Sequence, residues 1–231
     1  MKLSLWAVSC SSLIAFLSIS ATWTPVIPGS PSSASSARAV LENVDRRYNR
    51  LQSLRVEFTQ TYRGSGVERS ESGVLLLKKP GKMRWEYREP REKLFLSDGK
   101  TAYFYVPGER QARKAPVKKL DDLRSPLRFL LGKAQLAKEL EGAAISQSEK
   151  PLVTDSVVLT GVPRHMADRV ERVVLEIDSS SRIVRLVIQE NDGSETAFRF
   201  HGFEDNPKAA DDVFRFLAPA DVEVVEGALP E

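Results

Sequence analysis

The side chains that carry most enzyme chemistry are scarce in this sequence of 231 residues, which contains one Cys and two His. A His can transfer protons or bind a metal, and a Cys can act as a nucleophile or a metal ligand. His165 and His201 are isolated from each other and from any nucleophile at a motif spacing, and Cys10 lies inside an apolar run. We therefore predict that the protein is not an enzyme and holds neither a metal nor a cofactor.

The spacings that mark common catalytic and nucleotide-binding sites are also missing. The sequence contains no G-x-S-x-G, no H-E-x-x-H and no Walker-type glycine loop. The carboxylate pairs Asp121-Asp122 and Asp211-Asp212 are more typical of turns and helix caps. An esterase is a distant alternative, which requires His165 to lie in a cleft beside a Ser and a carboxylate. With 34 Lys and Arg against 31 Asp and Glu, the near-neutral chain is not a nucleic-acid-binding protein.

The sequence instead supplies apolar side chains at strand spacing. Between Lys82 and Arg88, the large residues Met83, Trp85 and Tyr87 alternate with charged residues. Successive side chains of a strand point to opposite faces, so this period of two predicts a strand with one buried face and one solvent-exposed face. Similar runs predict further strands over residues 56–62, 74–77, 93–97, 101–106, 157–160, 170–177, 183–189 and 196–203.

Helices are predicted in only a few places. Val40, Val44, Tyr48 and Leu51 recur at helical spacing, and short helices are expected over 125–132 and 134–140. Strands and helices do not alternate, which argues against a parallel sheet. We predict a mainly β (α+β) fold in which a single curved antiparallel sheet forms an incomplete β-barrel. Its apolar concave face needs a cover, for which these short helices are the candidates.

The N-terminus has the composition of an export signal. A positively charged start precedes the uncharged apolar stretch Leu3–Ser20, and small residues follow, of which Ala37 and Ala39 are the best cleavage points. The expected division is residues 1–37 as signal peptide and processed segment, and residues 38–231 as a single half-barrel domain. A retained membrane anchor is the alternative.

Several motifs in the middle of the chain resemble those of the LolA family of outer-membrane lipoprotein carriers. They are the run Lys78–Tyr87, the segment Leu96–Thr101 and the segment Phe104–Pro107. The opening helix followed by Phe58-Thr59-Gln60, and the later Ser125-Pro126-Leu127, fall in the matching order. The resemblance covers roughly residues 40–225.

This resemblance implies a periplasmic carrier, exported by a cleaved signal peptide. Such a carrier binds the acyl chains of lipoproteins in a hydrophobic cavity and moves them from the inner to the outer membrane. The implied partners are acylated lipoproteins, an inner-membrane ABC-type lipoprotein release complex and an outer-membrane acceptor, with the carrier as a monomer. The alternative is a sensor of lipid or lipoprotein that has the same fold and does not transport.

Side chains can be assigned to these roles in the carrier. The acyl-chain cavity is expected to be lined by Phe58, Leu75, Leu77, Met83, Trp85, Tyr87, Leu94 and Leu96. The underside of the lid is expected to consist of Val44, Tyr48, Leu51, Leu127, Leu130 and Leu131. In the family, an Arg before the Pro of the Lys78–Tyr87 run bonds the backbone of the lid and holds it shut. Lys79 takes that position here, and because an ammonium lacks the planar fork of a guanidinium, a weaker or differently built latch is expected.

Positive charge is concentrated in one region of the sequence. Residues 78–138 contain 17 Lys and Arg against seven Asp and Glu. Such a stripe would suit anionic headgroups or an acidic partner. The alternative is a solvated outer face that discourages pairing between sheet edges.

Overall fold

The computed structural model describes residues 33–117 and 135–229, all within one compact unit that runs from Pro31 to Glu231. Two α-helices are described, α1 (Ser33–Arg50) and α2 (Leu136–Glu139), with short 3-10 turns at Arg164–Met166 and Asp211–Phe214. The first strands are β1 (Ser53–Gly64), β2 (Val67–Lys78), β3 (Lys82–Glu89), β4 (Lys93–Asp98), β5 (Thr101–Tyr105) and β6 (Gln111–Pro116). The remaining strands are β7 (Leu140–Ile145), β8 (Val157–Pro163), β9 (Val170–Ile177), β10 (Ile183–Glu190), β11 (Glu195–Asp205) and β12 (Glu223–Glu226).

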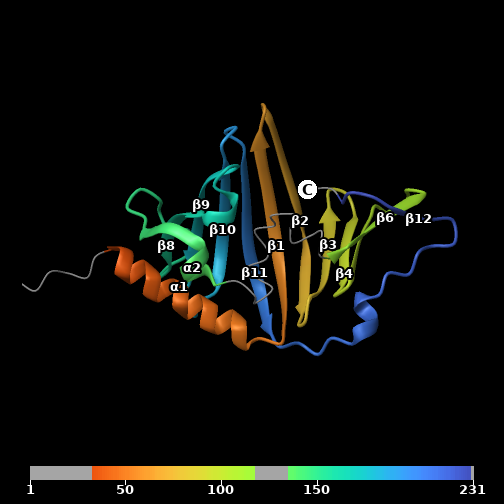
Figure 1. The fold of residues 1–231 in the computed structure, drawn as a ribbon, viewed down its shortest axis with the longest axis horizontal. Helices are drawn as coiled ribbons and strands as arrows, with labels where there is room; N and C mark the ends of the chain where they lie inside the picture. Colours follow the sequence, from red (N-terminus) through yellow and green to blue (C-terminus); the bar gives the residue numbers. More distant parts are fainter. Residues whose placement is uncertain (1–32, 118–134, 230–231) are drawn as a thin grey trace, which may run out of the picture. The chain divides into compact units, whose positions relative to one another are not determined.

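All twelve strands belong to one sheet, in the order β12-β6-β5-β4-β3-β2-β1-β11-β10-β9-β8-β7 (Figure 1). Neighbouring strands are antiparallel, except that β12 pairs with β6 in parallel. The sheet is curved and open, and it does not close into a barrel. The predicted mainly β class and single curved sheet are therefore confirmed. Within the described ranges, no helix is both long and apolar enough to cross a lipid bilayer.

The pairing register defines the two faces of the sheet. In an antiparallel pair, residues directly opposite each other lie on the same face. Trp85 of β3 lies opposite Leu75 of β2 and Phe95 of β4, and Leu75 lies opposite Val56 of β1. We call the face that carries these four side chains the inner face, and the opposite one the outer face.

Helix α1 packs on the inner face. Its residues Leu41, Val44, Tyr48 and Leu51, which follows the helix directly, are buried in one cluster with inner-face side chains of β1, β2, β3 and β8 to β11. The helix also contacts β7 and α2. The helical period predicted from 40 to 51 is thus real, and the helix begins earlier, at Ser33, with Ala37 fully buried.

Two glycine-containing positions shape the centre of the sheet. The β1–β2 hairpin turns at Ser65 and Gly66, with φ of 52° and 75°, in the left-handed region that Gly adopts without a steric cost. In β2, a Cβ on Gly73 would lie 1.8 Å from the carbonyl oxygen of Glu86 on β3. Only Gly permits the two backbones to approach this closely.

A buried carboxylate organises the outer face near β9. Glu176, fully buried, accepts hydrogen bonds from the backbone N–H groups of Leu152 and Val153, from Ser156 Oγ and from Arg185 Nε, each at 2.7 or 2.8 Å. Burial by itself raises the pKa of Glu176, but these donors and the Arg185 charge outweigh it and hold that pKa below 4.5. Through these hydrogen bonds the Glu176 carboxylate holds the loop between β7 and β8 against the sheet.

Several predicted elements differ from the structure. No strand is predicted between residues 107 and 124, but this part of the chain contains β6, whose apolar residues Ala112 and Ala115 are too small to give a clear alternation. Strand β7 was also missed, and the predicted helix over 134–140 is shortened to α2. The helix predicted over 125–132 lies outside the described residues.

Candidate functional site

The centre of the inner face is an aromatic cluster built from three strands. Phe58 of β1 meets Trp85 and Tyr87 of β3 edge-on, with ring centroids 5.4 and 5.1 Å apart. Trp85 and Tyr87 stack at 5.4 Å, and Phe198 of β11 lies 5.9 Å from Trp85. Phe200 stacks on Phe198. Phe198 and Phe200 follow the other three rings by more than 100 residues in the sequence. The pairing of β11 with β1 brings them together.

Six of the eight side chains predicted to line a cavity lie together on the inner face. They belong to one buried cluster or pack directly on it, and they are Phe58, Leu75, Leu77, Met83, Trp85 and Tyr87. The register of the sheet brings them together as the alternation in β3 predicted. They form a continuous apolar wall. Their role in binding acyl chains stays a prediction.

The prediction for Leu94 and Leu96 is wrong, because both lie on the outer face. Leu94 pairs with Glu86 and Leu96 with Arg84, whereas Phe95 between them pairs with Trp85. Strand β4 has three consecutive apolar residues, so its period of two fits either phase and the sequence carries no signal that selects one. Phe95 is the inner-face residue that sequence reasoning missed.

The aromatic cluster has a polar margin at the Tyr87 end of β3. Tyr87 Oη donates a hydrogen bond to Gln60 Oε1 at 2.8 Å, and burial raises the pKa of Tyr87. Lys93 Nζ lies 4.3 Å from the centroid of the Tyr87 ring and pairs with Glu71 at 2.6 Å. Along β3, the inner face thus changes from purely apolar at Met83 to polar beyond Tyr87.

Three of the six residues predicted to form the underside of the lid belong to α1 or follow it directly, and all three face the sheet. Val44, Tyr48 and Leu51 are all buried against the inner face. The other three residues of that prediction, Leu127, Leu130 and Leu131, lie outside the described residues. Beneath the end of α1, a recess lined by Tyr48, Leu51 and Leu77 has a volume of about 10 Å³, which holds one water molecule at most. Among the described residues, the buried side chains of α1 pack directly against the part of the inner face that the helix covers.

Lys79, the residue directly after β2, contacts the C-terminal end of α1 through its side chain. Its Nζ donates hydrogen bonds to the backbone carbonyls of Tyr48 and Asn49, at 3.0 and 2.9 Å. A cation is favourable at a helix C-terminus, where the last carbonyls have no partner within the helix. Burial lowers the pKa of Lys79. The predicted latch residue thus contacts the backbone of the helix that covers the inner face.

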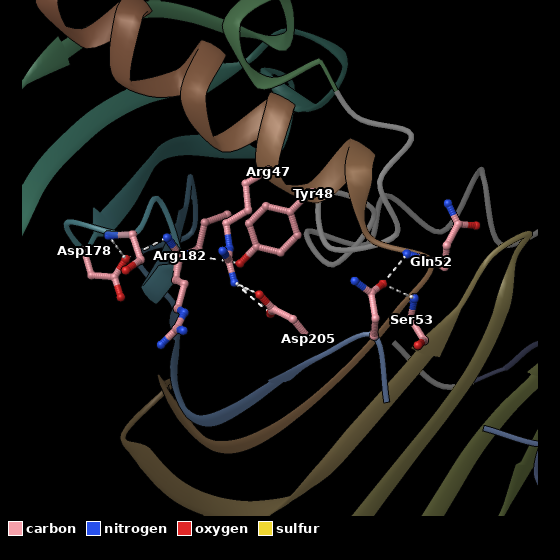
Figure 2. A network of polar contacts seen from close by, with 10 residues as sticks. Arg47, Tyr48, Gln52, Ser53, Asp178, Arg182 and Asp205 are labelled. Carbon is pink, nitrogen blue, oxygen red and sulfur yellow. Dashed lines mark hydrogen bonds and ion pairs between the residues drawn. The ribbon is translucent and has the colours of Figure 1, made fainter. Parts of the chain in front are cut away.

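Other polar contacts hold the same end of α1 to the sheet (Figure 2). Arg47 Nη2 donates to both carboxylate oxygens of Asp205 at 2.7 and 2.6 Å. The buried Tyr48 hydroxyl accepts from the Ile183 backbone N–H at 3.2 Å, and burial raises the pKa of Tyr48 to about 12. Just after the helix, Gln52 N donates to Asn206 Oδ1 at 2.7 Å. Polar anchors are therefore concentrated where α1 meets β1.

The side chain of Asp45 links α1 to α2. Its two carboxylate oxygens accept hydrogen bonds from the backbone N–H groups of Leu136 and Ala137, at 2.9 and 3.3 Å. Burial raises the pKa of Asp45, although these two donors act in the opposite direction. The contact joins residues 91 positions apart, so it belongs to the tertiary structure rather than to a local cap.

Neither His165 nor His201 belongs to the buried cluster of the inner face. His165 is exposed in the 3-10 turn after β8, and His201 is 62% exposed near Glu57. Among the described residues, no group of three or more His, Cys, Asp and Glu is placed to hold a metal ion. The basic stripe is partly neutralised, since several of its cations form ion pairs with Asp211, Glu86 and Glu71, namely Lys78, Lys82, Arg84 and Lys93.

An open curved sheet with an apolar inner face under a helix defines a half-barrel of the type that binds hydrophobic ligands. Residues 49–217 match the family described as outer membrane lipoprotein carrier protein LolA. The chain belongs to the LolA family. This membership supports a lipoprotein-binding carrier role and points to binding rather than catalysis.

Individual relatives agree with this assignment. The chain is 28% identical over 176 residues to an outer-membrane lipoprotein carrier protein of Nitrosospira multiformis, covering 74% of this chain and 81% of that protein. It is 28% identical over 183 residues to the protein of the same name from Cupriavidus taiwanensis, covering 76% and 82%. Among solved structures, the lipoprotein LppX of Mycobacterium tuberculosis is similar in fold, with a TM-score of 0.51 and 14% identity over 77% of this chain and 99% of that one.

Proposed function

We propose that this protein carries lipoproteins through the periplasm from the inner to the outer membrane, with their acyl chains bound on the inner face of the sheet. The observation that carries the proposal is the continuous wall formed by Phe58, Leu75, Leu77, Met83, Trp85 and Tyr87, which shares one buried cluster with side chains of α1. The upstream partner is an inner-membrane ABC-type release complex, and the downstream partner is an outer-membrane acceptor. The carrier acts as a monomer.

The physical need for such a carrier follows from the cost of exposing a lipid chain to water. Each buried CH₂ contributes about 0.8 kcal/mol, so one chain of about sixteen carbons costs about 12 kcal/mol to leave in water. A lipoprotein with two or three chains would not cross an aqueous compartment unaided. The inner face offers apolar and aromatic side chains that offset this cost.

Binding to the covered part of the inner face requires α1 to shift, because buried side chains of this helix pack there. Four side chains of this segment, Leu41, Val44, Tyr48 and Leu51, would lose their contacts with the sheet. At roughly 2 kcal/mol for each buried side chain, uncovering them costs about 8 kcal/mol. One acyl chain returns about 12 kcal/mol on burial, so cargo can displace the helix, and an empty carrier closes again.

The export signal belongs to the same proposal. We infer that residues N-terminal to α1 direct the chain to the periplasm and are removed. Helix α1 begins at Ser33 and Ala37 is fully buried in the core, which favours cleavage before Ser33 over cleavage at Ala37 or Ala39. A cut at either later site would remove part of the helix that covers the wall.

Native mass spectrometry of the protein isolated from its own cell envelope tests the proposal. A bound polypeptide with acyl chains supports transport of lipoproteins. Free phospholipid, or no bound lipid, contradicts it, and free phospholipid would favour a sensor of the same fold.

Two neighbouring substitutions add a matched test of the inner face. Phe95→Ser changes a half-buried residue on the inner face, and Leu94→Ser changes a half-buried residue on the outer face of the same strand. We expect Phe95→Ser to weaken binding of an acylated lipopeptide at least tenfold and Leu94→Ser to leave it within twofold. Equal losses in the two variants would show that the inner face does not hold the acyl chains.

A further inference from the structure

One buried polar atom on the inner face has no hydrogen-bond partner. The indole Nε1 of Trp85 is inaccessible to solvent and donates to no acceptor, and only 7% of the residue is exposed. Buried N–H groups are almost always paired in folded proteins, and leaving one unpaired costs about 1–3 kcal/mol. This residue is therefore maintained at a cost to the empty protein.

The described surroundings of Trp85 offer no acceptor in compensation. Its ring contacts are Phe58, Tyr87 and Phe198, and Phe58 meets it edge-on at 5.4 Å. A ring face is only a weak acceptor. The Tyr87 hydroxyl packs against the same cluster, but it donates to Gln60 and is not a hydrogen-bond partner of the Trp85 N–H. A buried water needs two to four polar partners, and the Trp85 ring packs among Phe58, Phe198 and other apolar side chains of the wall.

The position of Trp85 along β3 indicates which ligand atom would meet this N–H. On one side lie Met83 and its partner Leu77, which are purely apolar, and on the other side lies the polar margin of Tyr87 and Lys93. A lipid bound along this gradient would place its hydrocarbon on the apolar side and its polar head at the margin. The atoms at the junction are the carbonyl oxygens that join each acyl chain to its glyceryl or amino group.

We propose that the Trp85 indole N–H donates a hydrogen bond to an acyl carbonyl oxygen of the cargo, an ester or the amide of an acylated cysteine. This inference rests on the proposed function and adds a recognition element to it. The hydrogen bond fixes how deep the chains lie, because only one carbonyl position along each chain can meet the N–H. It also makes Trp85 selective for acyl groups over plain alkyl chains.

Binding of synthetic lipopeptides to Trp85→Phe and to the unaltered protein tests this proposal. The probes are a triacylated cysteinyl peptide, an analogue whose two esters are replaced by ethers, an analogue without the N-acyl group, and one with both changes. Phe retains an aromatic ring and removes the donor. We expect Trp85→Phe to bind the triacylated probe about fivefold more weakly and the probe without acyl carbonyls equally well. Loss of the effect with the ether probe alone assigns the ester, and loss with the N-deacylated probe alone assigns the amide.

The ¹⁵N-indole resonance of Trp85 gives a second readout that packing alone would not move. It is assigned as the signal that disappears in Trp85→Phe, and we expect its proton to shift downfield with the triacylated probe and not with the carbonyl-free one. Leu94→Ser is the control, since Leu94 lies on the outer face of the sheet. An equal loss of affinity for all four probes in Trp85→Phe, with no indole shift, overturns the inference and leaves the carrier function standing. If the unaltered protein binds none of the probes, both the hydrogen bond from Trp85 and the proposed carrier function are contradicted.

Discussion

Lys79→Met tests whether the contact between Lys79 and α1 controls access to the inner face. The substitution keeps an unbranched apolar stem and removes the ammonium that donates to the carbonyls of Tyr48 and Asn49. Hydrogen bonds from a charged donor are worth about 1.5–3 kcal/mol each when they are buried. Lys79 is partly exposed, and water can replace the donor, so we expect a total loss of about 1–2 kcal/mol from the two bonds.

Loss of these two hydrogen bonds should lower the thermal stability of the protein and raise its apparent affinity for cargo. For a domain of this size, thermal denaturation should show a midpoint about 2–8 °C lower. If the helix must move before cargo binds, the empty closed state competes with binding. Weakening that state by about 1–2 kcal/mol should then tighten the apparent affinity for an acylated lipopeptide by up to about 5- to 30-fold.

Lys78→Met is the matched control for this variant. Lys78 is the neighbouring residue and also donates two hydrogen bonds, to the Ala209 carbonyl and to Asp211, but neither partner belongs to α1. We expect it to lower the midpoint without tightening lipopeptide binding. The reasoning is refuted if both variants lose stability and neither changes affinity, or if Lys79→Met weakens binding.

Three further outcomes are expected. Gly73→Ala should lower the denaturation midpoint by more than 8 °C, because its Cβ would lie 1.8 Å from the Glu86 carbonyl oxygen; an unchanged midpoint would contradict the close approach of β2 and β3. Glu176→Gln should cost about 3 kcal/mol in a urea titration, since it breaks a buried pair with Arg185. The pKa of Glu176 lies below 4.5, so its carboxylate stabilises the fold above pH 4.5 and loses that contribution as the pH falls through its lower folded value, a step that the Gln variant should lack. N-terminal sequencing of the exported protein should find Ala37 retained, and its absence would contradict cleavage before the helix.

Local patterns were enough to predict the wall but not its boundary. The alternation of Met83, Trp85 and Tyr87 with charged residues fixes which side chains share a face, because the strand period is two wherever the strand runs. The same rule failed at Leu94 and Leu96, where apolar residues are consecutive and only pairing with β3 selects the phase.

The family, the mainly β class and the amphipathic character of the first helix could be predicted before the fold was known, since each depends on motifs or periods that are readable within a short window. Three features became visible only in the folded sheet: Lys79 meets the end of α1, Phe95 lies on the inner face, and the Trp85 N–H has no acceptor. These features depend on which strands become neighbours and in which register. Such pairing brings together residues from 10 to more than 100 positions apart, such as Trp85 with Phe95 and Phe58 with Phe200, and the sequence pattern of a single strand does not encode it.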